Sequence, residues 1–218
     1  MPAVKPLIDE ALTWAVEEII DRNRLAKLLK SKKKLVVKLG VDPTSTDLHL
    51  GHAVVLEKLR QFQQLGHQTT LVIGDFTALI GDPTGVNKTR PQLTKEQINQ
   101  NLQTYLKQAS LIIDLKKTKV VKNSQWLSQY SLERLIEEAA KISVNTLIER
   151  EDFASRLKSK QRVSLHEFIY PLVQAVDSVE LKADIELGGW DQRLNLLLGR
   201  ELQKKSGLDP QDIILISP

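Results

Sequence analysis

The sequence predicts an α/β fold, in which a parallel β-sheet carries helices on both faces and includes a mainly helical insertion. Two apolar runs, residues 35–41 and 69–75, have the composition of buried strands, and a helical pattern over 51–65 lies between them. A strand–helix–strand unit of this kind gives parallel strands joined by a right-handed crossover. The pattern is then mostly helical over about residues 94–160, which indicates an insertion between two halves of the sheet domain.

The composition is that of a folded protein without disulfides. Of the 218 residues, 41% are hydrophobic and 27% are charged, enough to bury the core of one α/β domain. The absence of cysteine excludes disulfides and thiolate metal sites. No apolar run approaches the ~18 residues of a membrane span, so we expect no membrane partner. The formal net charge of +4 favours a polyanionic partner only slightly.

We expect residues 1–34 to form an N-terminal helical segment ahead of a sheet domain over 35–218. Residues 1–29 have the mixed apolar and charged pattern of an amphipathic helix. Acidic residues within this stretch argue against a signal or transit peptide and so indicate a cytoplasmic protein; they are Asp9, Glu10, Glu17, Glu18 and Asp21.

Turn and capping residues set the bounds of the predicted elements. Asp42-Pro43 closes the first strand, and Gly66 ends the helix that follows it. A capping box of Thr94 and Gln97 opens a helix over 98–113, which is followed by a strand over 119–122 and by helices from 131. A second capping box, Ser164 with Glu167, opens a helix that should bend at Pro171. The last expected elements are a strand over 184–188, a helix over 191–206 and a strand over 213–216. Because the sequence stops two residues later, we expect the sheet domain to be incomplete at its C-terminus.

The stretch Asp47-Leu-His-Leu-Gly-His52 follows the first strand and opens the first helix of the sheet domain. Ligands of parallel sheets bind outside the carboxyl ends of strands, and a helix N-terminus favours anions such as phosphate. His49 and His52 could donate hydrogen bonds to phosphoryl oxygens, while Gly51 allows close approach of the backbone. Alternatively, one histidine caps the helix and the other is a core residue. The pair in this position favours the anion site.

Polar residues also gather after the second strand and on a later helix. Asp82 stands in Gly81-Asp-Pro-Thr-Gly85, which is either an ordinary turn or a site that holds an amino group. Tyr170, Gln174 and Asp177 have i, i+4, i+7 spacing and therefore share one helix face. That face either is solvated or lines a polar pocket in which Asp177 accepts a hydrogen bond from a hydroxyl group.

A glycine-rich turn, Gly188-Gly-Trp-Asp-Gln192, lies at another strand end and opens a helix. Asp191 is similar to the acidic residue that binds ribose hydroxyls in nucleotide sites, although the spacing differs from the dinucleotide fingerprint. Taken alone, this turn is weak evidence for a nucleotide site.

Together these motifs resemble bacterial tyrosyl-tRNA synthetases, which are class I aminoacyl-tRNA synthetases with a Rossmann-like catalytic domain. The resemblance runs from about residue 14 to the last residue. The motifs that carry it are His49-Leu-Gly-His52, Asp42-Pro-Thr44, Gly74-Asp-Phe-Thr77, Gly81-Asp-Pro83 and the Tyr170/Gln174/Asp177 face. The resemblance implies that tyrosine is activated with ATP to tyrosyl-adenylate and then transferred to tRNA(Tyr).

The resemblance also implies roles for individual residues. His49 and His52 would stabilise charge on the phosphates, with Thr44 in contact with the same region. On the amino-acid side, Asp177 would accept a hydrogen bond from the tyrosine hydroxyl. The ammonium group of tyrosine would be held by Asp82, Tyr170 and Gln174. Gln192 would lie near the carboxyl group of tyrosine. On the nucleotide side, Asp191 would bind the ribose, and Gly51, Gly188 and Gly189 would let adenosine lie against the backbone. Mg²⁺ would come with ATP, held mainly by phosphate oxygens, and no metal held by the protein is expected.

This chain departs from the family pattern in two places. Trp190 stands where the family usually has Ser or Thr, and its indole either points outward or fills the site. The family's Lys-Met-Ser-Lys-Ser loop does not occur in this sequence. The stretch Lys204-Lys-Ser206 is not that loop, because it lies too early in the chain and lacks the pattern. A tyrosine that reaches the substrate hydroxyl in some members aligns with Lys38, to which we assign no role.

Three functions are therefore compared. The first is a tyrosyl-tRNA synthetase catalytic domain, paired as a homodimer through the helical insertion and contacting the tRNA acceptor end. The second is a truncated paralogue that binds tyrosine, ATP or a partner subunit without completing the ligase reaction. The third, another nucleotidyltransferase with a His-x-Gly-His motif, would not need the Tyr170/Gln174/Asp177 face. The basic clusters 31–34 and 156–162 either face tRNA or are solvated surface.

Overall fold

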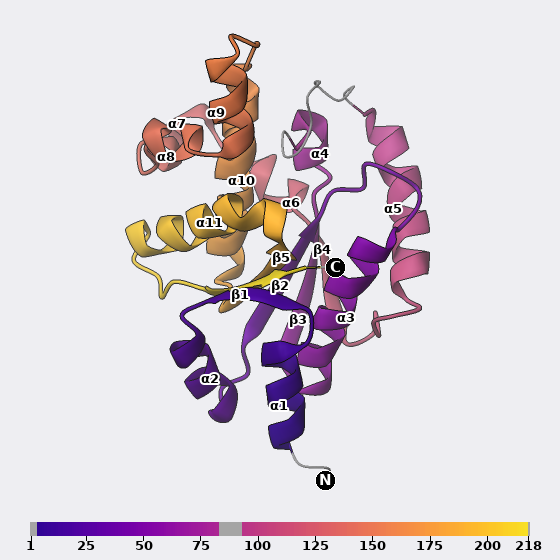
Figure 1. Cartoon of the computed structure of the whole chain (residues 1–218). Helices are drawn as coiled ribbons and strands as arrows, with labels where there is room; N and C mark the ends of the chain where they lie inside the picture. The colour runs from indigo at the N-terminus through magenta and orange to yellow at the C-terminus, as the bar shows by residue number, and fades with distance from the viewer. Residues whose placement is uncertain (1–3, 83–92, 218) are drawn as a thin grey trace.

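The computed structural model describes residues 4–82 and 93–217, which form a six-stranded sheet (Figure 1). The strand order is β1-β6-β5-β2-β3-β4, and all neighbours are parallel except β1 and β6. The strands are β1 (Val16–Ile20), β2 (Val36–Val41), β3 (Gln68–Ile73), β4 (Thr118–Lys122), β5 (Ile185–Gly189) and β6 (Asp212–Ile216). The predicted α/β class with a mostly parallel sheet is therefore confirmed.

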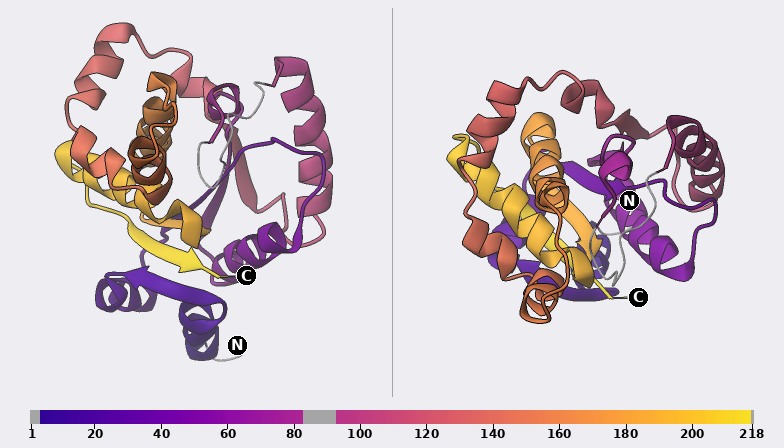
Figure 2. Two further views of the ribbon diagram at one scale, coloured as in Figure 1. Left: turned by 45° about the horizontal axis from the view of Figure 1, so that its top comes forward. Right: turned by 90° about the horizontal axis from the view of Figure 1, so that it is seen from above.

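Helices cover both faces of the sheet (Figure 2). On one face, α1 (Val4–Thr13), α3 (Leu50–Gln64) and α5 (Lys95–Ala109) pack on the sheet through a core that includes Leu59, Phe62 and Leu71. On the other face lie α10 (Leu165–Leu181) and α11 (Arg193–Lys205), with a second core around Val176 and Leu198. The other helical segments are α2 (Arg22–Lys30), α4 (Thr77–Ile80), α6 (Ser124–Leu127), α7 (Leu132–Ala139), α8 (Val144–Ile148), α9 (Glu151–Lys158) and the 3-10 turn η1 (Trp190–Gln192).

The predicted amphipathic helix over residues 1–29 is wrong in its middle, because Val16–Ile20 forms strand β1 on the edge of the sheet. Positive φ angles at Ala15 (51°) and Asp21 (62°) interrupt the helical path at both ends of this strand. The strand contains Val16, Ile19 and Ile20, whose β-branched side chains suit extended backbone. Its antiparallel pairing with β6 outweighs the helical pattern of the segment.

The range 94–160 contributes to the sheet as well as to its surroundings. Helix α5 leads into β4, which pairs in parallel with β3, so this part forms a second strand–helix–strand unit. The helices α6 to α9 follow β4 and lie outside the sheet (Figure 1). We therefore propose a narrower insertion, over about residues 124–163, than the one that the sequence suggested.

The local signals that bound the long helices are confirmed. Thr94 with Gln97 and Ser164 with Glu167 form the two predicted capping boxes. Gly66 and Gly207 have φ of 84° and 74°, the left-handed conformation that ends a helix most readily at glycine. Pro171 lies inside α10, and the bend expected there stays a prediction. Among residues 4–82 and 93–217, no helix is long and apolar enough to cross a membrane.

The order of the strands reverses between β2 and β5. From β2 the chain continues outward to β3 and β4 on one side, and β5 and β6 lie on the other. In open parallel sheets such a reversal leaves a crevice outside the carboxyl ends of the strands, because the flanking connections run to opposite faces. The loops after β2, β3 and β5 all reach this crevice, and they carry most of the motifs found in the sequence.

Candidate active site at the carboxyl ends of the strands

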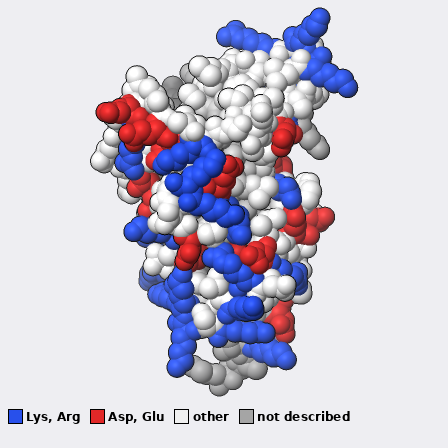
Figure 3. Space-filling view, turned by 90° about the vertical axis from the view of Figure 1, so that its left-hand side faces the viewer, with Lys and Arg blue, Asp and Glu red and all other residues white. Residues whose placement is uncertain are grey.

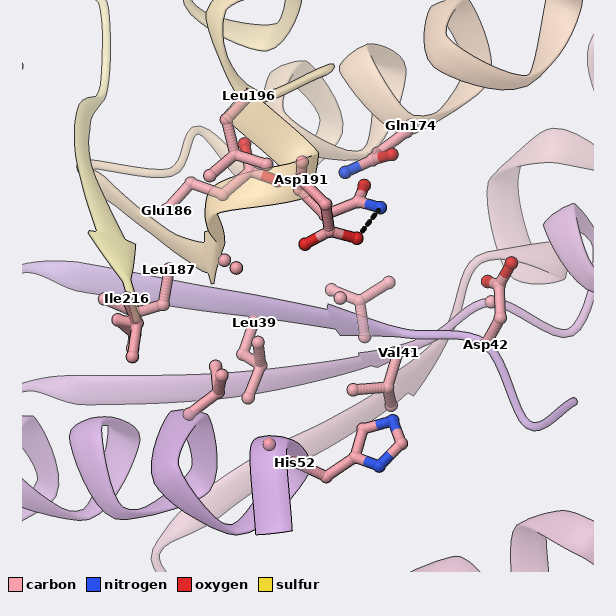
Figure 4. A pocket seen from close by; sticks show the side chains of 18 of the residues that line it. Leu39, Val41, Asp42, His52, Gln174, Glu186, Leu187, Asp191, Leu196 and Ile216 are labelled. Carbon is pink, nitrogen blue, oxygen red and sulfur yellow. Dashed lines mark hydrogen bonds between the residues drawn. The ribbon is translucent and has the colours of Figure 1, made fainter. Parts of the chain in front are cut away.

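A cavity of about 530 Å³ lies where the strand order reverses, and we call it the crevice. The predicted site residues that line it are His49, Gly51, His52, Tyr170, Gln174, Asp177, Gly188, Gly189, Asp191 and Gln192. Thr44 and Asp82 are not among its lining residues. Figure 4 shows His52 on the α3 side of the strands and Asp191 and Gln174 on the opposite side. Segments far apart in the sequence therefore meet at one site, as predicted.

The N-terminus of α3 brings both histidines to the crevice. The two ring centroids lie 3.9 Å apart with the planes tilted by 32°, and the His49 backbone N–H donates to His52 Nδ1 at 3.3 Å. Since Nδ1 accepts this bond, the neutral His52 ring carries its proton on Nε2. Burial, with a smaller contribution from the charge of His49, lowers the pKa of His52. His52 thus takes part in capping the helix and still has its Nε2–H as a donor. The role in capping and the role in an anion site are therefore compatible.

The loop between β2 and α3 is fixed by side chains of α5. Gln108 accepts from the Leu48 backbone N–H at 3.0 Å and donates to the Thr46 carbonyl at 2.8 Å. Asn101 donates to the Pro43 carbonyl at 2.9 Å. These bonds hold the approach to the helix N-terminus, and the partly buried Thr44 lies in this loop outside the crevice.

Asp177 is a buried carboxylate, only 4% exposed, with a fixed donor on each oxygen. Trp126 Nε1 donates to Oδ1 at 2.8 Å, and Asn123 Nδ2 donates to Oδ2 at 3.3 Å. Burial raises the pKa of Asp177 to about 7, while the charge of Lys38 and these two hydrogen bonds act to lower it. A carboxylate can accept more than two hydrogen bonds, so Asp177 can still receive one from a ligand hydroxyl in the crevice.

The partly buried Asp42 and the buried Tyr170 form a second polar group beside Asp177. The Tyr170 hydroxyl donates to Asp42 Oδ2 at 2.8 Å, and Thr77 Oγ1 donates to Oδ1 at 2.7 Å. Burial raises the pKa of Asp42 to about 7, and the negative charges of Asp82 and Asp177 act in the same direction against the Thr77 hydrogen bond. A Cβ on Gly74 would lie 1.8 Å from Asp42 Oδ1, so this position has no room for a side chain.

An amide chain connects α10 with the glycine-rich turn. Asn195 Nδ2 donates to Gln174 Oε1 at 3.1 Å and to Gln192 Oε1 at 3.0 Å. Gln192 Nε2 in turn donates to Asp82 Oδ2 at 2.8 Å. Although Asp82 does not line the crevice, this bond places it within the polar shell of the site. The turn residues 83–85, part of the predicted motif, lie outside the described residues.

The turn after β5 presents backbone to the crevice. A Cβ added to Gly188 would come within 2.9 Å of Leu196, and one added to Gly189 within 2.5 Å of Asp191. Asp191 is exposed, in contrast to the other carboxylates of the site. Trp190 also lines the crevice and is 52% exposed, so its indole neither fills the cavity nor lies fully outside it.

A buried ion pair lies at the floor of the crevice. Lys38 and Glu186 are neighbours in the parallel register of β2 and β5, 0% and 1% exposed, with Nζ 2.8 Å from Oε1. Lys38 Nζ also donates to Ser178 Oγ at 2.8 Å, and Ser178 donates to Glu186 Oε2 at 3.0 Å. Gln211 donates to the same carboxylate. Every polar group of the pair is thus satisfied within the protein, and Glu186 lines the crevice.

Sequence reasoning missed Asn123, Trp126 and Asn195, the side chains that orient the predicted site residues. Asn123 and Trp126 follow β4, about 50 residues before Asp177 in the chain, so no local spacing relates them to it. A signal for Asn195 existed, since it lies three residues after Gln192 on the same turn of helix. No group of three or more His, Asp or Glu side chains that could hold a metal ion occurs among residues 4–82 and 93–217.

A family model described as tRNA synthetases class I (W and Y) matches residues 30–218. This chain belongs to that family. A tyrosine–tRNA ligase of Carboxydothermus hydrogenoformans is 54% identical over 211 residues, and one of Francisella tularensis is 49% identical over 214 residues. These matches cover 95% and 98% of this chain but 51% and 54% of the relatives. The chain therefore spans about half the length of the curated relatives that it matches.

Solved structures of the family share this fold. A tyrosyl-tRNA synthetase from Archaeoglobus fulgidus, determined with L-tyrosine, is 25% identical with a TM-score of 0.80, over 98% of this chain and 64% of that one. A truncated mitochondrial tyrosyl-tRNA synthetase from Aspergillus nidulans has a TM-score of 0.83 at 22% identity, over 100% of this chain and 69% of that one. Both likenesses extend over the sheet and its flanking helices.

The buried ion pair generates a prediction about stability. Lys38→Met leaves Glu186 charged, buried and unpaired, and should lower the free energy of unfolding by about 3–5 kcal/mol. Replacing both residues with Met removes the unpaired charge and should cost less than Lys38→Met alone. Lys33→Met, at a lysine whose side chain is 53% exposed beside Asp184, serves as the matched control and should cost about 0–1 kcal/mol. Urea unfolding measures the free energy of unfolding of the three variants. A double variant less stable than Lys38→Met would contradict this explanation.

The raised pKa of Asp42 generates a prediction about pH. The carboxyl group titrates near 7 when folded but near 4 when unfolded, so its burial costs stability as pH rises from about 4 to 7. Relative to the wild type, Asp42→Asn should therefore gain roughly 3 kcal/mol of stability between pH 4.5 and pH 8. The amide can still accept from Thr77 and donate to the Tyr170 oxygen. Urea unfolding at both pH values tests this, with the exposed Asp47→Asn as control; equal differences at both pH values would refute it.

Proposed function

We propose that this chain is the catalytic part of a tyrosyl-tRNA synthetase and activates tyrosine with ATP to form tyrosyl-adenylate. The observation that carries the proposal is Asp177, a buried carboxylate with both oxygens oriented by the protein, in the same crevice as the His49/His52 helix N-terminus. The first feature suits a phenolic hydroxyl, and the second suits phosphate. A site with both features matches the two substrates of this reaction.

The amino-acid end of the crevice accounts for recognition of tyrosine. Asp177 accepts the phenolic hydroxyl, and phenylalanine would leave this buried carboxylate without that bond, which in comparable sites gives discrimination of ~10⁴–10⁵. Asp82, Tyr170 and Gln174 receive the ammonium group, and Gln192 lies near the substrate carboxylate. The contacts of Tyr170 with Asp42 and of Gln174 with Asn195 support this assignment, because they hold both side chains in place.

The α3 end of the crevice accounts for activation. A carboxylate oxygen of tyrosine attacks the α-phosphorus of ATP, and the bond from that phosphorus to the bridging oxygen breaks, releasing pyrophosphate. His49 and His52, at the positive end of the α3 dipole, stabilise the charge that builds on the phosphoryl oxygens. Thr44 lies outside the crevice and could contact the same region only from the loop that precedes α3. Asp191 binds the ribose, and Gly51, Gly188 and Gly189 allow close approach of adenosine. Mg²⁺ accompanying ATP would be held mainly by the phosphate oxygens and would neutralise part of their charge.

In the second step, the terminal ribose hydroxyl of tRNA(Tyr) attacks the tyrosyl carbonyl carbon and AMP leaves. Basic side chains on the surface support an anionic partner: Figure 3 shows many lysines and arginines, with acidic side chains among them, on the face that it draws. The exposed basic residues of the chain include Lys30, Lys33, Lys204 and Lys205. Arg156, by contrast, is buried in an ion pair with Glu167 and is not part of that surface. ATP and tRNA are cytoplasmic, and we propose the same location for this protein.

We further propose that two copies pair through the helices that follow β4. Large hydrophobic side chains are exposed on these helices and at the start of α10: Leu132, Ile136, Val144, Leu157 and Leu165 are 46–78% exposed. Leu132 and Ile136 are four residues apart on α7 and so share one face. Several such side chains close together typically mark a protein–protein interface.

A second candidate, a chain that binds tyrosine or ATP without completing the reaction, is favoured by Trp190. Its indole takes the position of a small hydroxyl side chain of the family and lies on the crevice wall. Turnover distinguishes the two candidates, because both predict ligand binding.

The experiment that tests the proposal is tyrosine-dependent exchange of pyrophosphate into ATP. We expect exchange by the wild type and a loss of about 10²–10³ in rate in His52→Ala, because a donor to the developing charge is removed. His166→Ala, at a histidine outside the crevice, is the matched control and should retain the wild-type rate. Binding of tyrosine or ATP without exchange would support the second candidate, and absence of binding of both ligands would contradict both candidates. Sedimentation of the same sample tests the dimer, which a monomer at every concentration would exclude.

A further inference from the structure

Trp190 is an aromatic side chain on the wall of the crevice to which the reaction above gives no part. It follows Gly189 directly in η1 and is 52% exposed. A half-exposed indole on a cavity wall offers a flat apolar surface that is only partly covered by the protein. The residues beside it, Gly188 and Gly189, add no side chains to that wall.

The register of the sheet places Trp190 near the end of the crevice that is remote from Asp177. Gly189 pairs with Ile216 at the end of β6, and both line the crevice. Asp177 instead receives its hydrogen bonds from Asn123 and Trp126, which follow β4. Because β6 and β4 lie on opposite sides of the β2–β5 pair, the strand order itself separates the two ends.

The indole is supported from the β1 side by a charged group. The Arg193 guanidinium carbon lies 5.8 Å from the centroid of the Trp190 ring, within the distance of a cation–π contact. Arg193 Nε and a terminal nitrogen donate to the two carboxylate oxygens of Glu18 at 2.6 and 3.2 Å. A two-pronged pair of this kind fixes the guanidinium plane. The ring therefore has an oriented charged neighbour while about half of its surface remains exposed.

The proposed function leaves one part of the substrates without a partner. With the phenol at Asp177 and the phosphates at His49 and His52, the purine base of ATP must occupy the remaining wall, where Gly188, Trp190 and Ile216 lie. We propose that the adenine ring stacks on the Trp190 indole, which makes Trp190 a determinant of nucleotide affinity in this chain. The inference rests on the proposed function, since that function sets where the phosphates lie.

Calorimetric titration of Mg²⁺–ATP into the wild type, Trp190→Thr and Trp190→Phe tests the inference. Stacking on an aromatic side chain should make the Kd for ATP about tenfold weaker in Trp190→Thr, or about 1.4 kcal/mol. Trp190→Phe keeps an aromatic face and should stay within about threefold of the wild type. Trp14→Thr changes a tryptophan that is 40% exposed but outside the crevice, and should leave ATP binding unchanged.

Tyrosine binding by each variant separates this inference from the function on which it rests. All variants should bind tyrosine as the wild type does, because Trp190 is remote from Asp177. Unchanged or tighter ATP binding by Trp190→Thr would overturn the inference. A parallel loss of tyrosine binding and ATP binding in this variant would also overturn it, because Trp190 would then be a structural residue. A wild type that binds tyrosine but not ATP would overturn the inference alone. A wild type that binds neither ligand would overturn the proposed function as well.

Discussion

The reversal of strand order between β2 and β5 is the constraint on which the site depends. On one side of this point α3 leaves β2 and packs on one face of the sheet, and α10 and α11 cover the other face (Figure 2). The connections therefore diverge and leave the crevice between them. His49 and His52 enter from the first of these faces, and Asp177 enters from the second. The two groups of residues face each other only because the sheet is ordered in this way.

The crevice contains several carboxyl groups whose ionisation costs stability. Asp42, Asp177 and Glu186 are carboxyl groups at its floor and wall, and Lys38 is a cation paired with Glu186. Burial raises the pKa of Asp42 and Asp177 to about 7, so keeping both ionised at neutral pH costs stability. Sites that bind charged ligands often carry such a cost. The ammonium group of an amino acid would offset it by adding a positive charge near these carboxyl groups.

Much of the fold and of the site could be predicted from local patterns. The spacing of Tyr170, Gln174 and Asp177 sufficed to place them on one face, because all three belong to one helix. Strand β1 was missed because acidic residues mask three β-branched ones in a segment that otherwise has a helical pattern. Lys38 and Glu186 each interrupt an apolar strand, and this was a signal that two buried strands carry opposite charges. Their pairing could not be read, because it depends on β2 and β5 being neighbours although about 150 residues separate them in the chain.

The central claim is that the carboxylate of Asp177 selects a ligand with a phenolic hydroxyl. Calorimetric titration of the wild type with tyrosine and, separately, with phenylalanine tests it most directly, because the two ligands differ by that one oxygen. We expect tyrosine to bind and phenylalanine to bind at least about a hundredfold more weakly, since Asp177 would remain buried without a ligand donor. Equal affinity for the two amino acids would contradict it, even if both bound tightly.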